Sequence, residues 1–139
     1  MTRSVKATIA GVVLLAGLGF WALRPSAPPP SVEEIAPAEK AAAVAFFRQA
    51  LAASQERSAY TGRRKFLRLA ANPRDREMNN NSFRLLRELR VTPEDRWRVV
   101  RHKKGGALEI SFRDGSDDRI VVMLEERGGG LKFAGAMRI

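Results

Sequence analysis

The stretch that decides the fold of this chain is Leu108-Glu-Ile-Ser-Phe-Arg-Asp-Gly-Ser-Asp-Asp-Arg-Ile-Val-Val-Met-Leu124. Apolar and polar residues alternate over residues 108–113, and this period of two predicts a strand with one buried face. The Asp- and Gly-rich residues 114–118 predict a turn, and residues 120–124 are apolar on both faces of the next strand. Because a short turn joins antiparallel neighbours, the stretch predicts a β-hairpin.

The same strand pattern continues on both sides of this hairpin. Residues 97–104 are rich in β-branched and aromatic side chains and end at a glycine turn at 105–106. Residues 131–139 alternate again after a glycine turn at 128–130. Four consecutive strands with short connections predict an antiparallel meander.

Helical periodicity precedes the strands. Residues 38–58 are rich in Ala and repeat apolar side chains at spacings of three and four, and residues 63–71 and 80–89 predict two further helices. Helices followed by strands predict an α+β domain, with the long first helix lying on a curved antiparallel sheet. The residues expected in the core between that helix and the sheet are Phe47, Leu51, Ile110, Phe112, Val122 and Phe133.

The N-terminal region contains a candidate membrane anchor. Residues 7–23 are seventeen uncharged, mostly apolar residues that follow a short tail, residues 1–6. As a helix they would span roughly 26 Å, close to the hydrocarbon thickness of about 30 Å. Arg3 and Lys6 precede the span and Arg24 follows it, which favours an N-terminus inside the cell. We therefore expect a single-pass signal anchor in the cytoplasmic (inner) membrane, with the rest of the chain extracytoplasmic.

Two other fates of this segment stay open. It could be a secretory signal that is cleaved near Gly17-Leu-Gly19, which would make the protein secreted, or an anchor whose domain faces the cytoplasm.

Residues 24–37 hold five of the seven prolines and predict an extended linker, since proline fixes φ and lacks an amide donor. Residues 38–139 then form one small domain.

The order of elements also carries a resemblance. Helices come first and a meander follows, and it closes with Val121-Val-Met-Leu-Glu-Glu-Arg-Gly-Gly-Gly-Leu-Lys-Phe-Ala-Gly-Ala-Met-Arg-Ile139. This pattern of strand, glycine turn and aromatic-containing strand resembles the nuclear transport factor 2-like (SnoaL-like) superfamily, over about residues 38–139. The resemblance implies a cone in which a curved sheet wraps a long helix and leaves a pocket. The superfamily includes isomerases, dehydratases, binding domains and membrane-tethered assembly subunits of bacterial secretion systems, so the fold alone does not select a function.

The residues that usually carry chemistry are sparse. His102 lies among cations beside a glycine turn, where an exposed position is expected, and Tyr60 is expected to pack at a helix–loop junction. Asp114, Asp117 and Asp118 share one loop but lack the later Glu of a calcium loop. The chain has no Cys, no metal-ligand spacing and no glycine loop that leads into a helix. The sequence therefore predicts no catalytic residue, no cofactor and no metal site; an enzyme or small-ligand-binding cone with an unidentified pocket is the alternative.

The positive charge is concentrated in the middle of the chain. Residues 57–104 hold fifteen of the 25 basic residues and five of the fifteen acidic ones, which equals the net charge of +10 of the whole chain. This favours a non-catalytic domain that binds a partner or scaffolds an envelope assembly: an acidic protein, anionic lipid or an envelope polymer. The predicted location outside the cytoplasm and the lack of a recognition motif disfavour nucleic acid as the partner. The competing interpretation is a basic face that is only solvated and binds nothing. Nothing in the sequence indicates an oligomeric state. The predicted patch comprises Arg63, Arg64, Lys65, Arg68, Arg84, Arg87, Arg90, Arg98, Arg101, Lys103 and Lys104.

Overall fold

The computed structural model describes residues 31–90 and 92–139 of this chain. The predicted tail at 1–6, the predicted membrane helix at 7–23 and the first part of the predicted linker lie outside these residues. Within the described part, no helix combines the length and hydropathy needed to cross a membrane. Residues Ser31–Ile139 form one compact unit.

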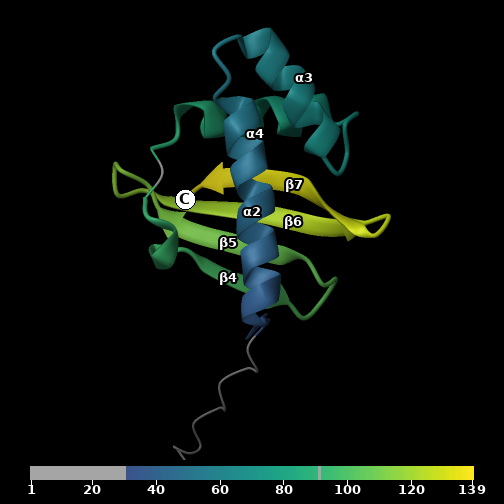
Figure 1. Cartoon of the computed structure of the whole chain (residues 1–139), viewed down its shortest axis with the longest axis vertical. Coiled ribbons are helices and arrows are strands. Elements are labelled where there is room, and N and C mark those ends of the chain that lie inside the picture. Colours follow the sequence, from purple (N-terminus) through teal and green to yellow (C-terminus); the bar gives the residue numbers. More distant parts are fainter. Residues whose placement is uncertain (1–30, 91) are drawn as a thin grey trace, which may run out of the picture. The chain divides into compact units, whose positions relative to one another are not determined.

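The domain consists of three helices packed on a five-stranded antiparallel sheet, which confirms the predicted α+β class. Helix α2 (Pro37–Ser54) crosses one face of the sheet, while α3 (Ala59–Leu69) and α4 (Arg76–Glu88) lie beyond its β7 edge (Figure 1). A short 3-10 helix, η1 (Glu94–Arg96), leads from the helices into the strands.

Side-chain caps explain why α3 and α4 begin earlier than the periodicity predicts. The Ser58 hydroxyl accepts a hydrogen bond from the Thr61 amide at 3.2 Å, and the Asp75 carboxylate accepts one from the Met78 amide at 3.2 Å. Each cap satisfies an amide that has no partner within its helix. The polar first turns of both helices therefore become helical although they carry no apolar stripe.

The strand order in the sheet is β3-β4-β5-β6-β7, with every neighbouring pair antiparallel. The strands span β3 (Val32–Glu34), β4 (Arg98–His102), β5 (Leu108–Arg113), β6 (Arg119–Arg127) and β7 (Gly130–Arg138). The last four form the predicted meander.

Strand β3 corrects the predicted linker. Val32 pairs with His102 and Glu34 with Val100, so residues 32–34 belong to the sheet and not to an extended spacer over 24–37. Pro37 occupies the first turn of α2, where its missing amide costs nothing. The domain therefore begins at Ser31, before the predicted boundary at residue 38.

All six residues predicted for the core are buried, and aromatic rings fill the space between the helices and the sheet. Trp97 stacks on Phe112 with ring centroids 5.0 Å apart, and Phe47 from α2 meets both rings at 5.4 and 5.9 Å. A second aromatic group beneath α3 and α4 consists of Phe66, Phe83 and Phe133.

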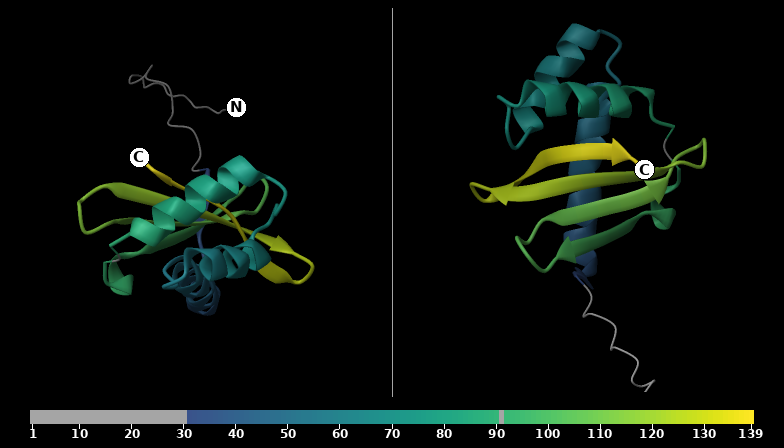
Figure 2. Two further views of the ribbon diagram at one scale, coloured as in Figure 1. Left: turned by 90° about the horizontal axis from the view of Figure 1, so that it is seen from above. Right: turned by 180° about the vertical axis from the view of Figure 1, so that it is seen from behind.

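The face of the sheet that is turned away from α2, here called the outer face, has no helix in front of β4, β5 and β6 (Figure 2). Helix α4 instead crosses the β7 edge, where the Ser82 hydroxyl accepts a hydrogen bond from the Ala136 amide at 3.1 Å. Because Val99, Ile110 and Val122 face the core, strand alternation places their neighbours on the outer face.

Candidate functional site: an arginine cluster on the outer face

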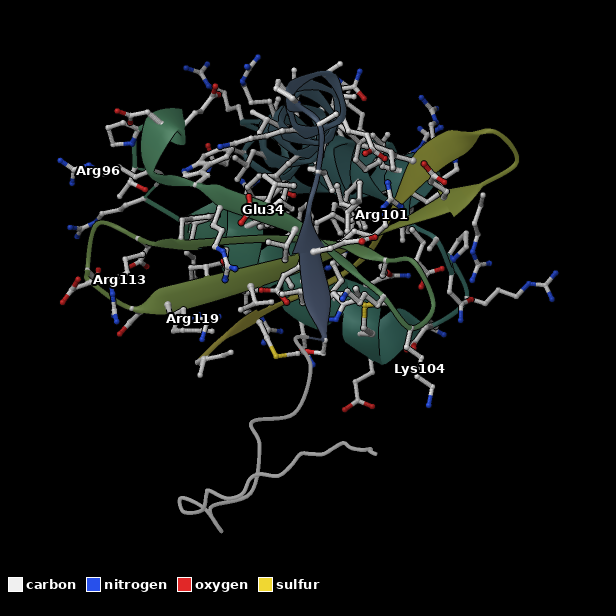
Figure 3. All side chains as sticks on the ribbon, turned by 90° about the horizontal axis from the view of Figure 1, so that it is seen from below. Glu34, Arg96, Arg101, Lys104, Arg113 and Arg119 are labelled. Carbon is white, nitrogen blue, oxygen red and sulfur yellow. The ribbon has the colours of Figure 1, made fainter. Side chains whose placement is uncertain are left out.

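Four arginines gather at one end of the outer face, and we call them the outer-face arginine cluster. Arg98 on β4 lies opposite Ser111 on β5, and Arg113, two residues after Ser111 on the same face, lies opposite Arg119 on β6. Arg96 from η1 joins these three at the rim of a shallow hollow of about 410 Å³. Figure 3 shows Arg96, Arg113 and Arg119 at the same end of the sheet.

Among the described residues, this cluster has one ion pair, although Asp114 and Asp117 line a neighbouring hollow with Arg96 and Arg113. Arg113 donates to the backbone carbonyl of Asp117 at 2.9 Å, and the nearest carboxylate oxygen to Arg119, from Glu109, is 3.9 Å away. In the described part of the chain, Arg96, Arg98 and Arg113 have no carboxylate at ion-pair distance. Like charges that face each other across two strands destabilise the pair. An anion bound between these guanidinium groups would relieve that repulsion.

Guanidinium groups suit a specific class of ligand. Their planar forks donate two parallel hydrogen bonds to a carboxylate or a phosphate, and they stay protonated throughout the physiological pH range. The cluster is exposed and open to solvent. It can therefore accept an anion that is part of a larger surface as well as a small ion.

The predicted patch residues of α3 lie away from the cluster, beyond the β7 edge of the sheet (Figure 1). Arg63 donates to the Asn80 side-chain carbonyl, and Lys65 pairs with Glu56 at 2.8 Å. The Arg64 guanidinium lies 5.8 Å from the ring centre of Tyr60. On the same helix, Arg68 is exposed.

The expectation that Tyr60 packs is wrong, since its side chain is 72% exposed. Only Gly62 and Phe66 of α3 are buried, and Tyr60 lies in the first turn, away from that buried side.

The predicted residues in and just after α4 have different roles. Arg87 reaches back to the end of α2 and donates to the carbonyls of Ser54 at 2.9 Å and Glu56 at 2.7 Å. Ser54 is the last residue of α2 and Glu56 follows it closely. A cation at this position interacts favourably with the negative C-terminal end of the helix dipole. Arg84 and Arg90 are exposed, and the Arg90 carbonyl accepts a hydrogen bond from Gly115.

The predicted residues of β4 are split between the faces and ends of that strand. Arg101 is on the helix-facing side, where it pairs with Glu39 and donates to the Gly106 carbonyl at 3.0 Å. Lys103 and Lys104 occupy the turn after β4, at the opposite end from Arg98, and Figure 3 shows Lys104 far from Arg113 and Arg119.

Of the predicted set, only Arg98 therefore joins the cluster. Sequence reasoning left out Arg113 and Arg119 because residues 105–139 hold more acidic than basic side chains. The available signal was the hairpin itself, since a symmetric turn over 114–118 sets residue 113 opposite residue 119.

The residues considered for chemistry are engaged in structural contacts. The His102 ring nitrogen Nε2 lies 2.9 Å from Glu109 Oε1, and the imidazole is half-buried on the outer face rather than exposed in the hairpin. The Asp114 carboxylate accepts hydrogen bonds from Arg138 at 2.7 Å and from the Ser116 and Asp118 amides at 2.8 and 3.0 Å.

The contacts of Asp114 change its pKa within the acidic loop, residues 114–118. The hydrogen bond from Arg138 is the largest effect that lowers the pKa of Asp114, and the two backbone amides lower it further. Arg138 also pairs with Asp118 at 2.7 Å. Across residues 31–90 and 92–139, no group of His, Asp and Glu side chains is arranged to hold a metal ion.

Comparisons with protein-family models, with curated proteins and with solved structures found no match for this chain. Membership of the nuclear transport factor 2-like superfamily therefore stays a prediction.

Proposed function

We propose that this chain is a membrane-tethered, non-catalytic, extracytoplasmic domain that binds an anionic partner through the outer-face arginine cluster. The predicted helix at residues 7–23 supplies the tether. The observation that carries the proposal is the direct opposition of Arg113 and Arg119, with no carboxylate at ion-pair distance from Arg113 in the described residues, beside Arg98 and Arg96.

The filled interior favours binding at the surface over catalysis in a cone. An enzyme or ligand-binding cone needs a cavity between the long helix and the sheet. In this domain Phe47, Trp97 and Phe112 pack against one another in that space. The superfamily resemblance fits the proposal through its membrane-tethered assembly subunits.

The test uses the full chain in detergent and two soluble polyanions, heparin and polyglutamate, immobilised on resin. Arg98→Glu combined with Arg119→Glu should release from both resins at clearly lower salt than the natural sequence. Salt acts on the interaction because the Debye length falls from about 10 Å at 0.1 M to about 3 Å at 1 M.

The matched control is Arg68→Glu combined with Arg84→Glu. It changes the net charge equally, but its residues are exposed on α3 and α4 at the β7 edge. If both double variants release at the same salt concentration, binding reflects net charge alone and the cluster is not a site.

A further inference from the structure

We infer that the partner of the outer-face arginine cluster is a surface of anionic lipid headgroups, on which this face of the sheet lies. The inference rests on the proposed function and names its partner.

Exposed apolar side chains beside the cluster are the first argument. Met137 and Ile139, at the end of β7, are 56% and 66% exposed. Met137 lies opposite Val121 on the outer face, and the Ile139 amide donates to the Arg119 carbonyl at 2.8 Å. A soluble polyanionic polymer would use the arginines but would leave these two side chains in water, whereas a lipid surface contacts both kinds of side chain.

The combination has the chemistry of a membrane interface. Apolar side chains enter the boundary between headgroups and acyl chains, while cations stay at the level of the phosphates. Each basic residue near anionic lipid is worth about fivefold in partitioning. A few arginines beside two apolar side chains therefore give useful affinity without a deep pocket.

The length of the chain before the domain is the second argument. Because β3 belongs to the sheet, only residues 24–30 separate the predicted anchor from Ser31. Seven residues in a polyproline conformation reach about 22 Å. A tether this short keeps the domain close to the bilayer and raises the effective concentration of the surface to which it binds.

Charges at the tether end of the same face support this orientation. The Ser31 carbonyl accepts a hydrogen bond from the Lys103 amide, so the chain enters the domain beside Lys103 and Lys104. Basic residues therefore lie at both ends of β4. Glu33 and Glu34 of β3 are both exposed, and Glu34, at the edge of the sheet (Figure 3), lies opposite Val100 on the outer face.

The experiment takes advantage of the absence of cysteine from the full chain. Met137→Cys carries a fluorophore, and Thr61→Cys, exposed on α3, is the matched control. Both proteins are reconstituted into phosphatidylcholine vesicles with or without phosphatidylglycerol, and quenching by headgroup spin-labelled lipid is measured. Thermal melts of the labelled proteins check that both are folded.

We expect strong quenching at position 137 only in the anionic vesicles, with its loss at high salt, and little quenching at position 61. Adding Arg98→Glu and Arg119→Glu should lower the ratio of docked to undocked domain about 30-fold or more, because each of the two cations removed contributes about fivefold. The Arg68→Glu, Arg84→Glu pair should leave quenching nearly unchanged.

Two results would overturn the inference: no quenching at position 137 in either vesicle, or equal quenching in neutral and anionic vesicles. The resin assay then separates the two proposals. If heparin or polyglutamate still binds through Arg98 and Arg119, the proposed function holds with a soluble partner and the lipid inference fails. If cluster dependence is absent from both assays, both proposals fail.

Discussion

Arg113 and Arg119 are directly opposite each other at the end of the β5–β6 hairpin, and among the residues that the structure describes the only carboxylate at ion-pair distance from either is Glu109, 3.9 Å from Arg119. An opposed pair of like charges lowers the stability of a hairpin by roughly 0.2–1 kcal/mol. The domain therefore carries a local electrostatic cost within the exposed outer-face arginine cluster.

Relief of that cost is the first prediction. Arg119→Thr should raise the free energy of unfolding by up to about 1 kcal/mol at low salt, because it removes the repulsion and Thr suits a strand. Thermal melts at low and high salt measure the effect, and the gain should shrink as salt screens the charges. A variant less stable than the natural sequence at low salt would show that Arg119 contributes a favourable contact.

The core provides the second prediction. Phe112 packs against both Trp97 and Phe47, so Phe112→Ala should lower the free energy of unfolding by about 3–5 kcal/mol through lost burial and a cavity. Urea unfolding followed by circular dichroism gives the value. An unchanged unfolding midpoint would contradict the burial of the Phe112 side chain on the core-facing side of β5.

Two arginines of α4, Arg84 and Arg87, should differ in their effect on stability, although the sequence predicted both in one patch. Arg87→Ala removes hydrogen bonds to the carbonyls that end α2 and should cost about 1.5–3 kcal/mol. Arg84→Ala, on the exposed side, should stay within about 0.5 kcal/mol of the natural sequence. Equal effects in urea melts would rule out the structural role of Arg87.

The acidic loop should make the domain sensitive to acid. Folding lowers the pKa of Asp114 below its ordinary value of 3.8, chiefly through Arg138. A carboxyl whose folded pKa is lowered contributes stability that is fully present above the ordinary value and is lost as pH falls through the folded pKa. Asp114→Asn should therefore be less stable than the natural sequence at neutral pH, and the difference in melting temperature should close below pH 3.8. A difference that is constant down to the lowest pH would point to packing instead of charge.

Topology is the fifth prediction. We expect residues 7–23 to stay attached as a single span with the domain outside, because two cations precede the span and one follows it. Protease added to spheroplasts should then degrade the domain. Full protection of the domain from protease would indicate the opposite orientation. A mature N-terminus near Phe20 would establish cleavage of the segment.

Local patterns in the sequence determined the class of each long element. The alternation of Ile110 and Phe112 with polar neighbours, and the spacing of Phe47 and Leu51, predicted both the secondary structure and the buried side, because burial acts on each residue through the period of its own element. Strand β3 escaped this reasoning. Three residues carry too little period to be recognised, and only pairing with β4 makes them a strand.

The position of each charge in space depended on the tertiary structure. The sequence by itself determined that positive charge is abundant and that most of it lies in residues 57–104. Packing then placed Arg87 on the end of α2 and turned Arg101 toward Glu39. Strand register brought Arg98 into one cluster with Arg113 and Arg119. Register depends on hydrogen bonds between segments far apart in the chain, so charge counted along the sequence could not find the cluster that the sheet assembles.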